Sequence, residues 1–169
     1  ASKGNSLANA LAEAAYMTSL ERNGDIVHMA SYAPLLAKLG HTQWNPDLIY
    51  FNNTQIFPTV NYYVQQLFGA NSGDTCLPTQ VSDKDIAISC VRDSKTKDMI
   101  LKIVNNSSVP KTLALELTGI NAAAAIKTTL TGDPKTVNDH KNTQPIVPQT
   151  ASITIGPKFD LEVAPYSLN

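Results

Sequence analysis

The chain has 169 residues, which suits one domain of ordinary size or a small domain with an appendage. Hydrophobic residues make up 43% of it, which excludes a disordered polymer, and its apolar runs are too short to span a membrane. The 13 basic and 14 acidic side chains give a net charge of -1, with no Lys/Arg cluster to hold nucleic-acid phosphates. These features indicate a soluble globular protein with no nucleic acid and no membrane as partner.

The first predicted element is an amphipathic helix over residues 7–22. Its apolar side chains recur at steps of three and four residues, Asn5 or Ser6 can cap it, and Asn23-Gly24 can end it. The nearly continuous apolar run of residues 26–30 follows directly. Such a run is typical of a parallel strand that is covered on both faces.

A second helix is expected over residues 34–39, because Pro34 is tolerated in a first helical turn and Gly40 can close the last one. Residues 48–52 are the other good strand candidate of the first seventy. Two strands do not make a covered parallel sheet. This region therefore either docks on a partner sheet or ends a larger α/β domain.

The second half of the chain has a different hydrophobic pattern. After a small polar linker near residues 70–74, the period changes from 3.6 to two, as in β-strands. The predicted strands cover residues 86–91, 99–105, 112–117, 125–130, 152–155 and 159–163. Short strands separated by Gly, Pro and Asn turns predict an antiparallel sandwich. The side chains expected to be largely buried are Leu11, Ala14, Val27, Met29, Leu113 and Leu115.

The two cysteines match no zinc or redox motif, because Cys76 and Cys90 are 14 positions apart. They are either two free thiols in or near a core, or a disulfide formed in an oxidising compartment. Asp139-His140 has no third ligand nearby in its loop. No metal site and no cofactor are therefore expected.

Three runs of sequence closely resemble one known family: AEAAYMTSLERNGDIVHMASYAPLL (12–36), WNPDLIYF (44–51) and PTVNYYVQQLF (58–68). They resemble the C-terminal part of α-L-arabinofuranosidases of glycoside hydrolase family 51, strongly over about residues 4–74 and diffusely beyond. In that family a (β/α)8 barrel carries the chemistry and a jelly-roll-like β-sandwich follows it.

The resemblance implies a fold class and a domain division. Residues 1–70 would be the C-terminal portion of the (β/α)8 catalytic barrel, 71–76 a linker and 77–169 the β-sandwich domain. Within the first part, residues 7–22 would be the seventh barrel helix, 26–31 the eighth strand and 61–68 the last helix. The expected fold is α+β, with terminal helix-strand-helix elements of a barrel followed by an antiparallel jelly-roll-like β-sandwich.

No catalytic residue is expected in this chain. The resemblance places both catalytic glutamates on earlier barrel strands, upstream of residue 1. Spacing agrees, since Glu13 and Glu21 lie about 12 Å apart along one helix axis, whereas a retaining glycosidase needs two carboxyl groups about 5 Å apart.

Three residues are expected to line the substrate. Ser31 and Tyr32 follow the expected eighth strand, and side chains at the C-terminal ends of barrel strands face the substrate. Trp44, the only tryptophan, either stacks on a sugar ring or packs its loop against the barrel. His28 lies inside the apolar strand, where a packed core or rim position is the simpler interpretation.

The leading hypothesis is a fragment of a secreted or periplasmic retaining glycosidase that removes terminal α-L-arabinofuranosyl groups from arabinan or arabinoxylan. The fragment alone is expected to be inactive and to self-associate as a homo-oligomer through an apolar face. The alternative is a non-catalytic carbohydrate-binding or architectural β-sandwich module. Phe159 and Tyr166 are the only aromatic residues of the sandwich, which favours the architectural role.

Overall fold

The computed structural model describes residues 4–119, 121, 124–142 and 145–169. Its two helices are α1 (Leu7–Arg22) and α2 (Val60–Ala70). Its strands are β1 (Leu36–Lys38), β2 (Ile49–Phe51), β3 (Ile56–Pro58), β4 (Thr75–Leu77), β5 (Ile86–Arg92), β6 (Met99–Asn105), β7 (Lys111–Glu116), β8 (Ala124–Thr131), β9 (Gln149–Thr154), β10 (Lys158–Val163) and β11 (Ser167–Leu168). Neither helix is long and apolar enough to cross a membrane.

The strands form three sheets. The largest has six strands in the order β4-β5-β6-β11-β8-β9, and each neighbouring pair in it is antiparallel. Strands β7 and β10 form a two-stranded antiparallel sheet, and β1-β2-β3 form a small separate one. The predicted α+β class with antiparallel sheets is confirmed, and the six strands predicted in the second half occur within three residues of their expected ends.

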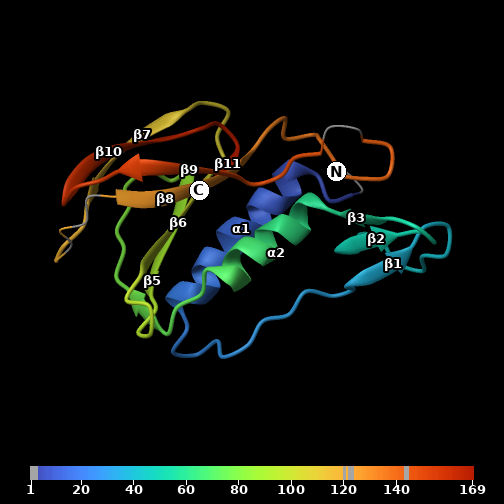
Figure 1. The fold of residues 1–169 in the computed structure, drawn as a ribbon, viewed down its shortest axis with the longest axis horizontal. Coiled ribbons are helices and arrows are strands. Elements are labelled where there is room, and N and C mark those ends of the chain that lie inside the picture. The colour runs from blue at the N-terminus through green and yellow to red at the C-terminus, as the bar shows by residue number, and fades with distance from the viewer. Residues whose placement is uncertain (1–3, 120, 122–123, 143–144) are drawn as a thin grey trace.

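Hydrophobic cores lie on both faces of the large sheet. Helices α1 and α2 lie side by side along one face (Figure 1), where their apolar stripes pack on Val104, Leu130 and Leu168. Strands β7 and β10 pack on the other face, where their leucines meet Ile88 and Ile103. Leu113 and Leu115 are half-buried there. The helices and the sandwich therefore share the large sheet.

Helix α1 has the predicted bounds. The Ser6 side chain accepts a hydrogen bond from the backbone N–H of Asn9, so Ser6 caps the helix, and Asn23 follows its last turn. Leu11 and Ala14 are buried, as expected. Helix α2 covers the last predicted helix and is capped in the same way by Thr59.

The structure corrects two predictions in the first half. Residues 26–31 form no strand, and Ile26 and Met29 are 75% and 88% exposed. A covered parallel strand needs hydrogen-bonded neighbours, and no strand among the described residues pairs with this run. Residues 34–39 form no helix, because β1 instead pairs with β2 in parallel register, Leu36 opposite Ile49. This half is therefore less helical than predicted.

The two cysteines are free thiols, Cys76 exposed and Cys90 buried. In the register of β4 and β5, Cys76 lies opposite Val91 and Cys90 opposite Leu77. Neighbouring residues of a strand point to opposite faces, so the two thiols point to opposite faces of the sheet. Burial raises the pKa of the Cys90 thiol to about 11. Strand β4 begins at Thr75, so the connection after α2 is shorter than the linker expected over residues 71–76.

Candidate functional site

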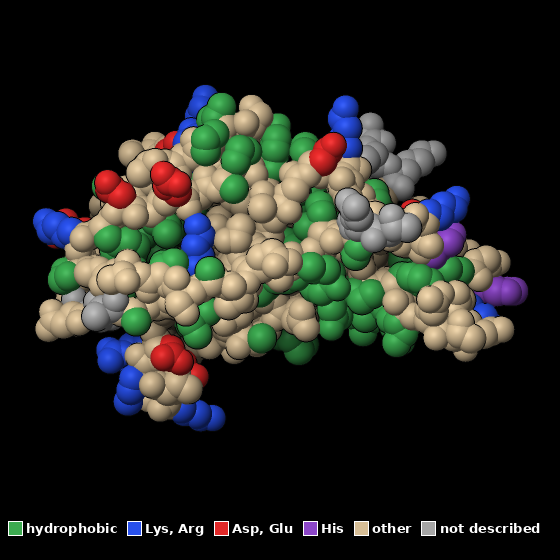
Figure 2. Space-filling view, turned by 45° about the horizontal axis from the view of Figure 1, so that its top comes forward, with side chains coloured by type: hydrophobic (Ala, Val, Ile, Leu, Met, Phe, Trp, Pro, Cys, Tyr) green, Lys and Arg blue, Asp and Glu red, His purple; other side chains and the backbone are tan. Residues whose placement is uncertain are grey.

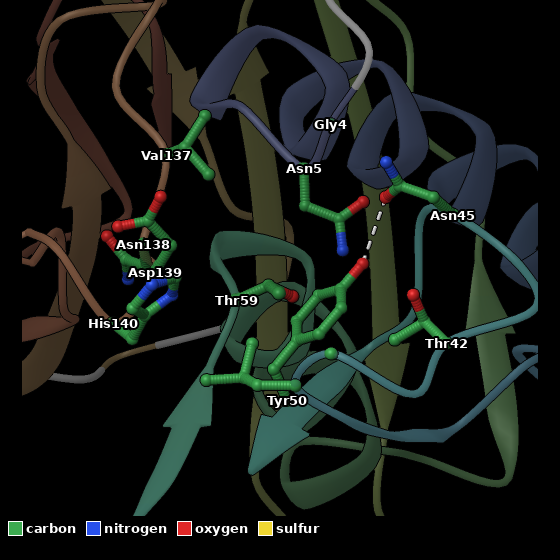
Figure 3. Close-up of a pocket in the computed structure, with 12 residues that line it drawn as sticks. Gly4, Asn5, Thr42, Asn45, Tyr50, Thr59, Val137, Asn138, Asp139 and His140 are labelled. Carbon is green, nitrogen blue, oxygen red and sulfur yellow. Dashed lines mark hydrogen bonds between the residues drawn. The ribbon is translucent and has the colours of Figure 1, made fainter. Parts of the chain in front are cut away.

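A pocket with a volume of about 270 Å³ opens where three distant segments of the chain meet (Figure 3). One segment precedes α1, the second surrounds β1 and β2 up to the start of α2, and the third follows β8. The lining residues are Gly4, Asn5, Leu39, Gly40, Thr42, Asn45, Tyr50, Thr59, Val137, Asn138, Asp139 and His140. The third segment lies across the pocket from Thr42 and Asn45, with Asn5 and Tyr50 between them.

Hydrogen bonds fix the centre of the lining. The Tyr50 hydroxyl donates to Asn45 Oδ1 at 2.9 Å and accepts from the Asp47 backbone N–H at 2.9 Å. The Asn5 side-chain amide donates to the Asp47 carbonyl at 2.6 Å. The buried Thr59 hydroxyl donates to a backbone carbonyl at 2.7 Å. These polar groups are held in place before any ligand arrives.

The third segment is fixed in a similar way. Asn138 is 2% exposed, and its side-chain amide exchanges two hydrogen bonds with the backbone of Ile146, at 2.6 and 2.8 Å. The His140 ring contacts Phe57 of β3 edge-on, with 6.0 Å between ring centroids. Asp139 Oδ1 accepts the backbone N–H groups of Lys141 and Asn142. This loop therefore has a defined position over the pocket.

A cluster of polar side chains lies between α1 and α2. The Glu13 carboxylate accepts hydrogen bonds from the amides of Asn61 and Gln65. Burial raises the pKa of Glu13, and these two hydrogen bonds partly offset the effect. Burial and then the charge of Glu13 raise the pKa of Tyr32, whose hydroxyl lies within hydrogen-bonding reach of Asn5.

The structure shows the surroundings of the three residues predicted to line a substrate site. Ser31 is exposed, and its hydroxyl contacts only the neighbouring carbonyl of Tyr32, at 3.4 Å. Tyr32 is half-buried beside the pocket residue Asn5, and Trp44 is 66% exposed next to Asn45. None of the three lines the pocket. His28 is exposed, so of the two positions expected for it, packed core or rim, the core position is wrong.

Sequence reasoning missed most residues that do line the pocket. Asn45 lies in a turn recognisable from Asn45-Pro46-Asp47, but that turn gave no sign of a ligand site. Asn5 was considered only as a helix cap. Asn138 and His140 lie far along the chain from Tyr50, and no local pattern relates them.

The described carboxylates do not form the pair that glycoside hydrolysis requires. Glu21 is bound to Lys102 at 2.5 Å and to Ser89 at 2.6 Å, and Glu116 pairs with Lys158 at 3.1 Å. Asp139 is the one carboxylate among the lining residues. The described residues include no group of three or more His, Cys, Asp or Glu side chains that could hold a metal ion.

Comparison with known proteins points to one family. The family described as the α-L-arabinofuranosidase C-terminal domain matches residues 1–167. An extracellular exo-α-L-arabinofuranosidase of Streptomyces chartreusis is 52% identical over 82 residues, 48% of this chain and 10% of that protein. α-L-Arabinofuranosidase 2 of Arabidopsis thaliana is 34% identical over 168 residues, 95% of this chain and 25% of that protein. The chain thus spans a quarter or less of these relatives.

Solved structures agree with this match. The arabinose-bound MgGH51 α-L-arabinofuranosidase superposes with a TM-score of 0.92 at 35% identity, covering 98% of this chain and 27% of that one. The thermostable α-L-arabinofuranosidase of Thermotoga petrophila superposes with a TM-score of 0.86 at 18% identity, covering 96% of this chain and 37% of that one. The second comparison shows a shared fold.

Proposed function

The chain belongs to the α-L-arabinofuranosidase C-terminal domain family, and we propose that it serves a retaining glycosidase that removes terminal α-L-arabinofuranosyl groups from arabinan or arabinoxylan. The observation that carries this is the family match over residues 1–167. Its superposition on 27% of an arabinose-bound enzyme, over 98% of this chain, supports it. The extracellular Streptomyces relative supports secretion over a cytoplasmic location.

The proposed role of the chain is to complete the catalytic barrel of the enzyme. It supplies none of the catalytic groups. In this view the seventh helix of a (β/α)8 barrel is α1. The eighth strand is residues 26–31, and the last helix is α2. The run 26–31 is a coil here and becomes a strand once a neighbouring barrel strand offers hydrogen-bond partners. Its exposed Ile26 and Met29 would be covered at the same time.

Exposed apolar side chains support this arrangement. They are Ile26, Met29, Leu35, Leu36 and Ile56, in the run after α1 and around the β1-β2-β3 sheet, and each is at least 53% exposed. Figure 2 shows hydrophobic side chains gathered toward the part of the molecule that carries β1–β3. Such side chains on a monomer mark an interaction surface. We assign this surface to contact with the rest of a longer polypeptide, and residues 77–169 to the β-sandwich that follows the barrel.

Ser31, Tyr32 and Trp44 remain candidates for lining the substrate in the complete enzyme. Ser31 and Trp44 are exposed in this chain and therefore available to face another part of the protein. Side chains that follow the last barrel strand belong to the catalytic face of a barrel. These three residues would shape a subsite and would transfer no proton.

An activity assay tests this function. The purified 169-residue chain is incubated with an aryl α-L-arabinofuranoside, beside a chimera that joins it to the N-terminal part of the MgGH51 enzyme. We expect no turnover by the chain alone and turnover by the chimera, because the two required carboxylates come from the added part. Turnover by the chain alone that disappears in Glu13→Gln or Glu21→Gln would contradict the proposal.

A further inference from the structure

We propose that the pocket formed by Asn5, Tyr50 and the 137–140 segment binds an uncharged sugar ring. The ligand class is a neutral, polyhydroxylated ring the size of one monosaccharide, free or at the end of a polysaccharide. The proposal goes beyond the proposed function, since it assigns binding to this chain by itself and depends on the pocket's own lining. The proposal follows from the volume of the pocket and from the charge, the hydrogen-bonding groups and the apolar surface of its lining.

The volume sets the size of the ligand. Pockets for drug-sized molecules measure roughly 300–1,000 Å³. The pocket here, at about 270 Å³, falls just below that range. It therefore suits a single small ring, with the neighbouring units of a chain remaining in solvent.

The charges of the lining select an uncharged ligand. Among the described residues that line the pocket there is no Lys or Arg side chain to pair with a phosphate or carboxylate group. Asp139 supplies one negative charge, and two backbone N–H groups already bind its Oδ1. The absence of a three-ligand cluster among the described residues argues against a metal-dependent ligand.

The polar groups match the hydroxyls of a sugar. Amides and hydroxyls both donate and accept hydrogen bonds, as sugar hydroxyls do. Tyr50, Thr59 and Asn138 are held by protein hydrogen bonds, so little ordering is required when a ligand binds. Within the described part of the chain, the Thr42 hydroxyl and the Asn45 side-chain N–H group have no protein partner and are available to the ligand.

Apolar groups complete the match. Leu39 and Val137 contribute hydrocarbon surface to the lining, and Tyr50 contributes an aromatic ring. Sugar rings carry C–H groups on their faces, which pack on such surface while the hydroxyls bind the polar groups. A single carboxylate cannot both attack and protonate a glycosidic bond, so the pocket binds a sugar without cleaving it.

Amide chemical shifts measured during ligand titration test the proposal. L-Arabinose and D-xylose are titrated into the 15N-labelled chain, with D-glucuronate and inorganic phosphate as charged probes. We expect saturable shifts at Asn45, Tyr50, Asn138 and His140 with a neutral sugar, and a dissociation constant on the order of 1 mM or weaker for so small a ligand. Saturation by glucuronate or phosphate at lower concentration than by either sugar would overturn the assigned ligand class.

Two variants and a matched control locate the binding. Thr42→Val keeps the side-chain shape and removes the hydroxyl, and Asn45→Ala removes the amide. Each should weaken sugar binding roughly two- to tenfold, the value of one hydrogen bond. Asn106→Ala, an exposed asparagine outside the lining, should bind normally. Thr42 is exposed, so its variant keeps the test valid if Asn45→Ala unfolds.

Two results would overturn the proposal: no saturable shift with either sugar, or unchanged binding in Thr42→Val and in a folded Asn45→Ala. Both are independent of glycosidase activity. The enzymatic assay of the chimera can therefore succeed while sugar binding by this pocket fails, and the reverse outcome is equally distinguishable.

Discussion

Two glutamates of α1 bind neighbouring parts of the fold through their carboxylates. Glu13 links α1 to α2 through the amides of Asn61 and Gln65. Glu21 links α1 to the large sheet through Lys102 of β6 and Ser89 of β5. The structure uses both for packing, and each can be tested separately.

Replacing Glu13 by Gln should make stability less dependent on pH. Burial raises the pKa of Glu13, so the folded protein binds its proton more tightly than the unfolded chain does. Its contribution to stability is thus complete below the ordinary value of 4.5 and is lost as the pH rises through the raised folded pKa. Urea unfolding from pH 4 to pH 7 should show a smaller loss of stability in Glu13→Gln than in the parent chain.

A carboxylate outside this cluster provides the control for Glu13. The Glu116 side chain is 66% exposed in its ion pair with Lys158, so Glu116→Gln should retain the parental pH dependence. An identical pH dependence of the free energy of unfolding in Glu13→Gln and the parent would refute the role given to Glu13.

Replacing Lys102 by Met should destabilise the protein by about 3–5 kcal/mol, because it leaves the Glu21 carboxylate without its buried partner. The side chains of Lys102 and Glu21 are 6% and 18% exposed, and the Lys102 ammonium also lies 5.1 Å from the centre of the Phe68 ring. Urea unfolding measures the loss. The double variant Glu21→Leu/Lys102→Met should recover most of it, since both charges are then removed. A double variant as unstable as Lys102→Met would contradict this account.

At the scale of elements, the connection from α2 to β4 is tightly packed. A Cβ atom on Gly73 would lie 2.6 Å from the Arg92 carbonyl oxygen and 2.8 Å from its carbon. The backbone of this connection therefore approaches the end of β5 more closely than a side chain would permit. Gly69, only four positions earlier but within α2, has no atom within 4 Å of the equivalent position.

This contrast gives a matched pair of substitutions. Gly73→Ala should destabilise the chain by about 1–3 kcal/mol, because the Arg92 backbone would have to shift. Gly69→Ala should stabilise it by up to about 1 kcal/mol, because alanine is the better helix former. Thermal unfolding of both variants measures the difference. A Gly73→Ala variant as stable as Gly69→Ala would contradict the claim that this connection is too tightly packed for a Cβ atom.

At the scale of the whole molecule, several large apolar side chains of the first half are not covered by other described residues. The exposed side chains of Ile26, Met29, Leu36 and Ile56 belong to the run after α1 and to the small β1-β2-β3 sheet. The buried face of the helix layer is covered by the large sheet. This surface is where the chain would meet the catalytic part proposed above.

The isolated chain should therefore self-associate. Burying this surface against a second copy removes apolar area from water, which is favourable at roughly 25 cal/mol per Å². Sedimentation at micromolar concentration should show oligomers, and a hydrophobic dye should bind the remaining monomer. Met29→Lys combined with Leu36→Lys should shift the equilibrium to monomer, whereas Lys95→Glu on the β5–β6 turn should not. A parent chain that is monomeric and binds no dye would contradict this prediction.

The sequence by itself determined the elements that depend on local pattern. The 3.6-residue period and the cap predicted α1, and alternation of period two predicted β5–β10. The resemblance to family 51 rested on contiguous runs, and the family match confirms it. Each of these signals lies within one short stretch, so the rest of the fold was not needed to interpret it.

Only the tertiary structure decided which surfaces are covered and which residues meet. The apolar run 26–31 looks like a covered strand, but a strand exists only where another strand offers hydrogen bonds, and the described residues provide none there. The register of β4 and β5 places the side chains of Cys76 and Cys90 on opposite faces of the sheet. The pocket joins Tyr50 to Asn138, far along the chain, through contacts that no local pattern encodes. Burial and pairing are properties of two segments at once, and a sequence pattern describes only one.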